Sequence, residues 1–246
     1  MSYDVVGSMF DGLSGTMIAL HEKLGITPRE YHAFEVDPYS SAVSRYNYPD
    51  IIRHGDARNW RNLEGKKIDL FVAGFPCQSY SVAGLRQFQD DPRDMSKVLL
   101  DALRGLAIDK VLIENVASMP SEWRDYFTKI FKEIFPDIEC YKENSSNDSA
   151  QQRWRLYWTN IKFTRSDDKG IVLQDILEDG GMVDRDKSYC LDVRVVVISL
   201  ACLRINLAID NLTTFYLRHS PPTLHSRESG TLALPTVYPL DYIITL

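Results

Sequence analysis

The chain contains 246 residues, of which 44% are hydrophobic and 25% are charged, and these values are ordinary for a globular protein. A chain of this length can form one sizeable domain and a smaller appendage. The formal net charge of −6 excludes a generally basic protein. Any nucleic-acid partner therefore has to be bound by a local cluster of positive charge.

The sequence predicts a cytoplasmic protein. Its N-terminus lacks the basic region, the apolar region and the cleavage site of a secretion signal. The longest apolar run, Val195–Leu203, is about half of the ~20 residues that cross a bilayer, so no membrane partner is expected. The cysteines form no CxxC pair, which favours free thiols and argues against a metal site. They are Cys77, Cys140, Cys190 and Cys202.

Apolar and amphipathic stretches alternate over residues 1–164. Strands are predicted at residues 3–9, 31–36, 68–73 and 110–114, and helices at residues 16–24, 95–106 and 121–135 and from Pro38 onward. This alternation predicts parallel crossovers and a doubly wound, Rossmann-like α/β sheet. The pattern ends after residue 164, so residues 165–246 are predicted to form a small irregular appendage.

The unusual residues of the chain follow the predicted strands. Ligands of a doubly wound sheet bind at the carboxyl ends of its strands, so these residues are expected to form one composite site. They lie at positions 10–15, 35–37, 55–57, 75–81 and 114–116.

The segment Phe10–Gly15 lies between a predicted strand and a predicted helix, where glycines let the backbone approach a ligand closely. Its GxxG spacing departs from the dinucleotide GxGxxG pattern, which disfavours hydride chemistry. Glu35 ends the second strand, where a carboxylate can hold ribose hydroxyls, and Asp56 can accept a hydrogen bond from an adenine amino group. The alternatives are a tight strand–helix turn and, for each carboxylate, a helix N-cap.

Cys77 follows Pro76 at the end of a buried strand and is a candidate nucleophile. The other cysteines are interpreted as small hydrophobic residues. Glu114 ends the next strand and can bring a carboxyl group into the same crevice. Arg153 and Arg155 are two residues apart and therefore share one face of a strand that continues through residues 156–158.

Four segments in this order resemble the motifs of the C5 cytosine-specific DNA methyltransferase family. They are Phe10–Gly15 (FDGLSG), Pro76-Cys77-Gln78, Glu114-Asn115-Val116 and residues 151–155 (QQRWR). The longer strings GFPCQSYSVAG, LIENVASM and SAQQRWRLYWTNI resemble its phage and prophage branch, which implies a bacterial or phage-infected host cell.

This resemblance implies an S-adenosylmethionine-dependent enzyme that flips a cytosine out of double-stranded DNA. Cys77 would add to C6, Glu114 would share a proton at N3, and Arg155, with Arg153, would contact O2. Residues 1–164 would be the catalytic and S-adenosylmethionine-binding domain. The cofactor-binding residues implied are Phe10, Asp11, Gly12, Leu13, Ser14, Gly15, Glu35, Val36, Asp56, Ala57 and Pro76. The substrate-binding residues implied are Gln78, Ser81, Asn115 and Gln151.

Residues 165–246 would be an incomplete or atypical target-recognition region. The two closing motifs of the family are not found in residues 193–246, so the chain is expected to be truncated or to have its end replaced. Residues 165–246 carry 8 basic and 11 acidic residues, which agrees with a missing DNA-gripping part. Weak cofactor binding, missing target specificity or a second polypeptide that supplies the closing motifs would follow.

Three other functions are considered. A tRNA cytosine-5 methyltransferase would carry a Cys-Phe-Thr signature, which does not occur in this sequence. A non-catalytic regulatory relative usually loses the nucleophile or the glutamate, yet Cys77 and Glu114 are both present. A nucleotide-binding oxidoreductase is disfavoured by the lack of GxGxxG.

Overall fold

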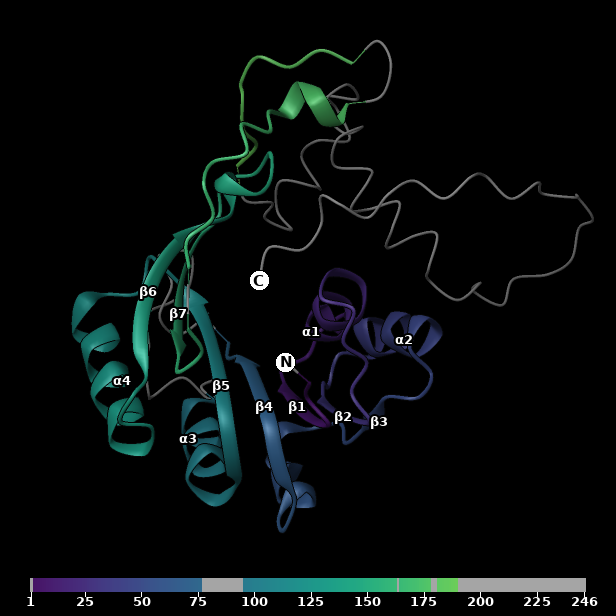
Figure 1. Ribbon diagram of the computed structural model, residues 1–246, viewed down its shortest axis with the longest axis vertical. Coiled ribbons are helices and arrows are strands. Elements are labelled where there is room, and N and C mark those ends of the chain that lie inside the picture. Colours follow the sequence, from purple (N-terminus) through teal and green to yellow (C-terminus); the bar gives the residue numbers. More distant parts are fainter. Residues whose placement is uncertain (1, 77–94, 163, 178–180, 190–246) are drawn as a thin grey trace, which may run out of the picture.

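The structure of the protein is a computed structural model that describes residues 2–76, 95–162, 164–177 and 181–189 (Figure 1). These residues form a sheet in the order β3-β2-β1-β4-β5-β7-β6. Neighbouring strands from β3 to β5 are parallel, whereas β7 is antiparallel to both β5 and β6. The strands are β1 (Val5–Met9), β2 (Glu30–Phe34), β3 (Ile52–Arg53), β4 (Lys67–Gly74), β5 (Ala107–Val116), β6 (Glu139–Asn144) and β7 (Trp154–Thr159).

Except for the last one, which follows β7, the helices lie in the connections between strands, and they cover both faces of the sheet. They are α1 (Gly15–Ile18) with the π-helix η1 (Ala19–Lys23), α2 (Pro38–Asn47), η2 (Ala57–Leu63), α3 (Ser96–Gly105), α4 (Ser121–Ile134), η4 (Ser145–Asn147) and η5 (Leu173–Ile176). Within the described ranges, no helix combines the length and apolar character needed to span a bilayer.

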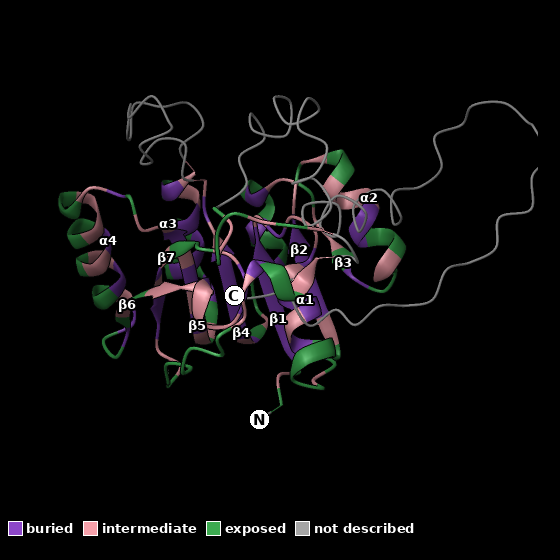
Figure 2. Ribbon diagram, turned by 90° about the horizontal axis from the view of Figure 1, so that it is seen from above, coloured by how far each residue is buried: buried purple, intermediate pink, exposed green. Residues whose placement is uncertain are grey.

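Alternate residues of the strands pack into two separate cores. Val5 and Phe71 belong to the core that η2, α3 and α4 cover, whereas Val6 and Val72 belong to the core that α1 and η1 cover. The period of two along each strand sends neighbouring side chains to opposite faces. Figure 2 shows the resulting buried strands β1, β2 and β4 at the centre of the molecule. The predicted doubly wound fold class is confirmed.

Local signals explain where α2 begins. Pro38 occupies the first turn, where its missing N–H costs nothing, and the Asp37 carboxylate accepts a hydrogen bond from the Ser40 N–H at 2.7 Å. The predicted strands and helices agree with the observed ones within a few residues, except that the helix predicted at 16–24 is α-helical only through Ile18 and then π-helical.

The prediction of parallel crossovers does not hold for the connection from β6 to β7. The connection from β6 to β7 contains only the short helix η4, and a connection without a crossover helix returns the chain in the opposite direction. As a result β7 lies between β5 and β6 and runs against both.

The described part of the predicted appendage is attached to the β6–β7 connection. The Lys187 ammonium group donates to the carbonyl oxygens of Ser146, Ser149 and Ile171 at 2.7, 3.1 and 2.5 Å. The backbone of Ser188 bonds the segment that leads into β7, donating to Ala150 O at 2.7 Å. The described residues after position 164 therefore contact the β6–β7 connection directly, and the division at residue 164 stays a prediction.

The contact between Gly105 and Trp60 gives a test of the packing beneath α3. A Cβ atom added at Gly105 would lie 2.5 Å from the buried Trp60 ring, so Gly105→Ala should lower the free energy of unfolding by about 1–3 kcal/mol. Urea denaturation measures this change. Gly15→Ala is the matched control, because nothing lies within 4 Å of its added Cβ. Equal stability of the two variants would contradict the packing described.

Candidate functional site

Strand register brings the predicted site segments to one edge of the sheet. Met9 pairs with Phe34 of β2 and with Ala73 of β4, and Gly74 pairs with Glu114 of β5. Because these strands are parallel, the residues that follow them emerge side by side at their carboxyl ends. The segments at 10–15, 35–37, 75–76 and 114–116 therefore share one edge, as the sequence predicts.

The turn after β1 has an unusual backbone conformation. Phe10, Gly12 and Ser14 all have positive φ angles of 58°, 56° and 64°. Glycine adopts this region freely, but a non-glycine residue there is strained, which points to a constraint imposed by the surroundings. The Gly12 N–H donates to Glu35 Oε2 at 2.8 Å and fixes the turn against the end of β2.

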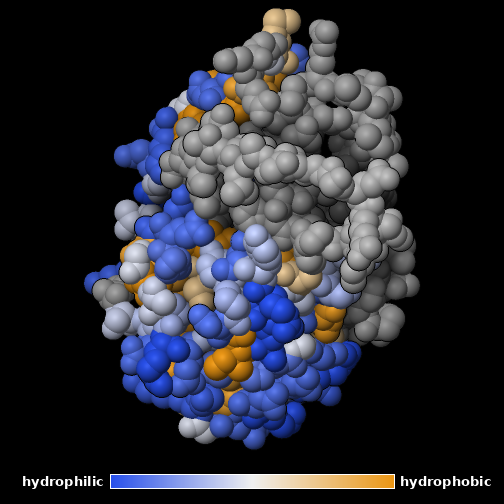
Figure 3. Space-filling model, turned by 90° about the vertical axis from the view of Figure 1, so that its right-hand side faces the viewer, coloured by the Kyte–Doolittle hydropathy of each residue, from blue (hydrophilic) through white to orange (hydrophobic). Residues whose placement is uncertain are grey.

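The Glu35 carboxylate lies between two backbone segments. Its Oε1 accepts from the N–H groups of Val36 and Asp37 at 2.8 and 2.7 Å, while Oε2 accepts from Gly12. Val36 itself is 69% exposed, so the end of this strand opens to solvent. Figure 3 shows that the described surface on the side that lies to the right in Figure 1 is mainly hydrophilic, with a few hydrophobic patches. Glu35 is held at the edge of the sheet, where a ligand can reach it, and its contact with ribose stays a prediction.

Asp11 is placed differently from the other residues of the turn. Its side chain is buried and accepts hydrogen bonds from the Ser14 hydroxyl and from the Tyr31 hydroxyl, each at 2.6 Å. Burial raises the pKa of Asp11, and the bonds from Ser14, Ser8 and Tyr31 oppose that rise. Leu13 and Gly15 are half-buried beside it.

Asp56 caps the helix η2. Its carboxylate accepts from the Arg58 N–H at 2.8 Å and pairs with the Arg58 guanidinium at 2.7 Å. The alternative of an N-cap is thus realised, and its contact with adenine stays a prediction, as does the contact of the buried Ala57 with the cofactor. Pro76 is half-buried at the end of the β4 segment.

Glu114 and Arg155 form an ion pair across β5 and β7. Nε of Arg155 lies 2.6 Å from Oε1 of Glu114. A Cβ atom added at Gly74 would lie 3.2 Å from Glu114 Oε2, so the carboxyl group lies over the β4 backbone two residues before Pro76. A glycine at position 74 leaves the space that this placement needs.

Burial raises the pKa of Glu114, and the charges of Arg155 and then Arg153 oppose that rise. The balance gives a carboxyl group that holds its proton to higher pH than a solvated glutamate does. Tyr157 is its neighbour across the β5–β7 pairing, and burial together with the Glu114 charge raises the pKa of Tyr157 to about 12. Tyr157 was not among the predicted site residues.

Asn115 ties β5 to the segment before the candidate nucleophile. Its Nδ2 donates to the Phe75 carbonyl oxygen at 3.1 Å, and its Oδ1 accepts from the Val116 N–H at 2.8 Å. Gln151 is bridged to Ser188 through its backbone, and its side-chain Nε2 lies 3.5 Å from Tyr189 O. Substrate contacts of Asn115 and Gln151 stay predictions. Cys77, Gln78 and Ser81 lie outside the described residues.

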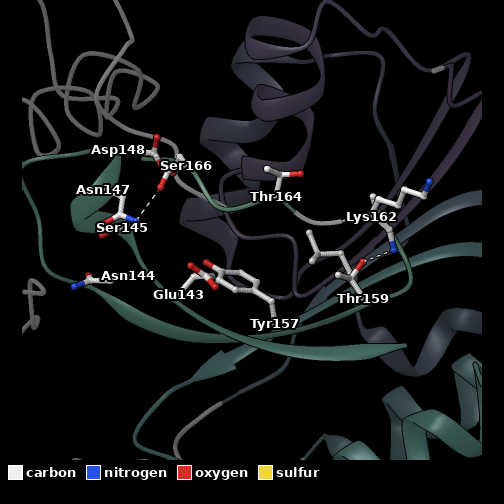
Figure 4. Close-up of a pocket in the computed structure, with 12 residues that line it drawn as sticks. Glu143, Asn144, Ser145, Asn147, Asp148, Tyr157, Thr159, Lys162, Thr164 and Ser166 are labelled. Carbon is white, nitrogen blue, oxygen red and sulfur yellow. Dashed lines mark hydrogen bonds between the residues drawn. The ribbon is translucent and has the colours of Figure 1, made fainter. Parts of the chain in front are cut away.

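A cavity of about 370 Å³ lies on the β5–β7–β6 face beside the ion pair, lined by Tyr157, Glu143 and the segment after β7 (Figure 4). Neither Glu114 nor Arg155 lines it, so these two predicted catalytic residues lie outside this cavity. Among the described residues, no group of three or more His, Cys, Asp or Glu side chains is placed to hold a metal ion.

Residues 5–166 match the family described as C-5 cytosine-specific DNA methylase, and this match covers more than half of the chain. The chain belongs to the C-5 cytosine-specific DNA methylase family. The resemblance found in the motifs is therefore confirmed.

Two curated relatives match shorter regions of this family member. The type II methyltransferase M.AquIA of Picosynechococcus is 37% identical over 46% of this chain and 48% of the relative. The orphan methyltransferase M.Rho11sI of Bacillus phage rho11s is 27% identical over 64% of this chain and 33% of the relative. In both cases the matched region is less than half of the relative's length.

The fold of this C-5 cytosine-specific DNA methylase also resembles that of Spodoptera frugiperda DNMT2, with a TM-score of 0.55. That match covers 87% of this chain and 83% of DNMT2 at 16% identity. At this identity the likeness concerns the fold alone.

The ion pair makes a prediction about titration. Because the Arg155 charge lowers the pKa of Glu114, Arg155→Gln should shift that pKa upward. Carbon-13 NMR of the carboxyl group, recorded over a pH series, measures the shift. Arg153→Gln is the control and should give a smaller upward shift, since Arg153 is the weaker of the two influences. A pKa of Glu114 that does not rise in Arg155→Gln would show that the Arg155 charge does not act on Glu114.

Proposed function

We propose that this chain is the catalytic part of an S-adenosylmethionine-dependent DNA (cytosine-5)-methyltransferase. The observation that carries the proposal is the Glu114–Arg155 ion pair, which lies over Gly74 and so beside the strand that leads to Pro76 and Cys77. A buried carboxyl group next to a guanidinium suits the recognition of a polar heterocycle. Family membership supports cytosine as that heterocycle.

The turn after β1 fits S-adenosylmethionine. Added Cβ atoms at Gly12 and Gly15 meet nothing within 4 Å, so the backbone leaves open space for a ligand at this turn. Glu35 at the end of β2 would accept hydrogen bonds from ribose hydroxyls, as acidic residues do at this position of doubly wound sheets. When bound, the cofactor supplies the methyl group that the activated cytosine takes up at C5.

Cys77 would act as the nucleophile. Its thiolate would add to C6 of the cytosine, and the electron pair of the C5–C6 bond would move so that C5 becomes nucleophilic. Arg155 and Arg153 contribute positive charge to this site, which favours a thiolate over a thiol of reference pKa ~8.5. Loss of the C5 proton after methylation would expel Cys77 and restore the ring.

Glu114 would hold the cytosine through N3. Burial raises the pKa of Glu114, so the carboxyl group can share a proton with the ring nitrogen when the thiolate adds. Arg155, which the ion pair holds beside Glu114, would contact O2 of the same ring. Both groups then oppose the negative charge that develops on the base.

Double-stranded DNA is the proposed substrate, and the target base has to leave the stack to reach these groups. The matched regions of the curated relatives are less than half of their lengths, so target recognition and full activity are assigned to residues or to a second polypeptide beyond the catalytic part. A tRNA cytosine is the alternative substrate.

Covalent trapping tests the nucleophile. DNA that contains 5-fluorocytosine should form a stable adduct with the protein in the presence of S-adenosylmethionine, because fluorine cannot be eliminated as the proton is. A denaturing gel detects the adduct. Cys77→Ser should abolish it, whereas Cys140→Ser should preserve it, since burial raises the pKa of the Cys140 thiol. An adduct that survives Cys77→Ser would refute the assignment, and an adduct only with 5-fluorocytosine tRNA would favour the alternative.

Cofactor titration tests Glu35. Glu35→Ala should weaken S-adenosylmethionine binding by about 1.5–3 kcal/mol, the usual value of a hydrogen bond to a charged group. Isothermal titration calorimetry measures the change. Glu139→Ala is the control and should bind normally, because Glu139 is exposed at the start of β6. Unchanged affinity of a folded Glu35→Ala would mean that Glu35 only organises the backbone around it.

A further inference from the structure

A continuous line of hydrogen bonds, part-buried at Arg53 and buried from Ser44 onward, joins Arg53 in β3 to Asp11 in the turn after β1. The Arg53 guanidinium donates through Nη2 to Ser44 Oγ at 2.9 Å. Ser44 Oγ lies 2.6 Å from Ser14 Oγ, and the Ser14 hydroxyl donates to Asp11 Oδ2 at 2.6 Å. The other three residues of the line, Ser44, Ser14 and Asp11, are all buried.

The chemistry of the groups fixes the direction of these bonds. A guanidinium can only donate and a carboxylate can only accept, and each serine hydroxyl has one hydrogen to give. Ser14 gives its one hydrogen to Asp11, so the hydrogen in the bond between Ser44 and Ser14 must come from Ser44, which itself accepts from Arg53. Every hydrogen in the line therefore points from the Arg53 cation toward the Asp11 carboxylate. The four residues Arg53, Ser44, Ser14 and Asp11 are called the relay.

Arg53 is held in place by bonds that do not involve the relay. Its guanidinium also donates to the carbonyl oxygens of Tyr48 and Ile51, each at 2.8 Å, in the segment that joins α2 to β3. With Nη2 bonded to Ser44, its charge reaches the Asp11 carboxylate through two hydroxyl groups. Ser44, on α2, is the residue that connects Arg53 to Ser14 and Asp11.

The relay ends on the most strained part of the candidate cofactor site. Ser14 has φ 64° and Phe10 has φ 58°, conformations that cost non-glycine residues of order 1–3 kcal/mol each and persist only where surroundings enforce them. Asp11 lies between these two residues, and both of its carboxylate oxygens are bonded, to Ser14 and Tyr31. The carboxylate therefore faces the interior.

We infer that Ser44 and Arg53 are positioning residues for the cofactor turn, acting through Ser14 and Asp11. The relay stabilises the buried Asp11 carboxylate, and this carboxylate holds Ser14 in its left-handed conformation. Gly12, between them, is thereby kept where its N–H group meets Glu35. Asp11 thus shapes the site from within rather than touching the ligand. The identity of that ligand, S-adenosylmethionine, rests on the proposed function.

Isothermal titration of the full chain with S-adenosylmethionine tests the inference. Ser44→Ala should weaken binding about tenfold, the effect expected for one buried hydrogen bond. Ser44→Thr and Ser44→Val form a matched pair, because they add the same bulk and differ only in the hydroxyl. Ser44→Thr should bind about tenfold more tightly than Ser44→Val at similar melting temperature. Equal binding by these two variants would overturn the inference.

The titration of Asp11 provides a readout that a purely structural role of Ser44 would not move. The relay favours the ionised carboxylate, so its loss in Ser44→Ala should raise the pKa of Asp11 above the wild-type value. When the pH is lowered, Ser44→Ala should therefore lose affinity for S-adenosylmethionine at a higher pH than the wild type does. The charged and titratable groups that face this network are Tyr31 and Glu35 beside Asp11, and Arg45 beside Arg53.

Carbon-13 NMR of the Asp11 carboxyl group separates the two proposals. If the wild-type chain does not bind S-adenosylmethionine, the proposed function fails, but the relay still predicts a higher pKa of Asp11 in Ser44→Ala. If the wild type binds and the pKa of Asp11 is unchanged in the variant, the proposed function stands and the relay fails. A raised pKa with unchanged affinity would show that the relay exists but does not position the turn, which also overturns the inference.

Discussion

The antiparallel placement of β7 between β5 and β6 is the constraint on which the candidate catalytic site depends. A strand that runs against β5 begins where β5 ends, so Arg155 at the start of β7 meets Val116 and lies beside Glu114. A parallel β7 would bring its first residues to the opposite edge of the sheet, one strand length away from Glu114. The short β6–β7 connection, which has no crossover helix, therefore decides that a carboxyl group and a guanidinium share one site.

Positive charge in this protein is local rather than general. The chain carries a net charge of −6, yet the charges of Arg155 and Arg153 both act on Glu114 at the strand ends. Such a cluster needs no overall basic field to bind an electron-rich base, although it leaves phosphate contacts to other residues. The proposed chemistry therefore does not require these two arginines to contact the DNA backbone, and the family match covers residues 5–166.

The candidate cofactor site, at the ends of β1 and β2, contains hydrogen-bonded carboxylates, whereas the candidate catalytic site, at β5 and β7, contains an ion pair. Asp11 is bonded by hydroxyl groups and Glu35 by backbone N–H groups, so these two carboxylates lie in different surroundings. The buried one fixes the backbone of the turn, and the one at the sheet edge remains within reach of a ligand. Burial, which raises the pKa of Asp11, makes the surrounding hydroxyl donors necessary.

The sequence by itself determined the alternating strands and helices, the start of α2 at Pro38 and the segments that gather at one edge of the sheet, because these depend on local periodicity and capping. It also carried the motifs that identify the family. Tertiary structure alone decided the direction of β7, the bond from Asn115 to Phe75 and the line from Arg53 to Asp11. These contacts join residues that are 40 or more positions apart or come from different elements, and no local pattern encodes which distant groups meet when the sheet closes.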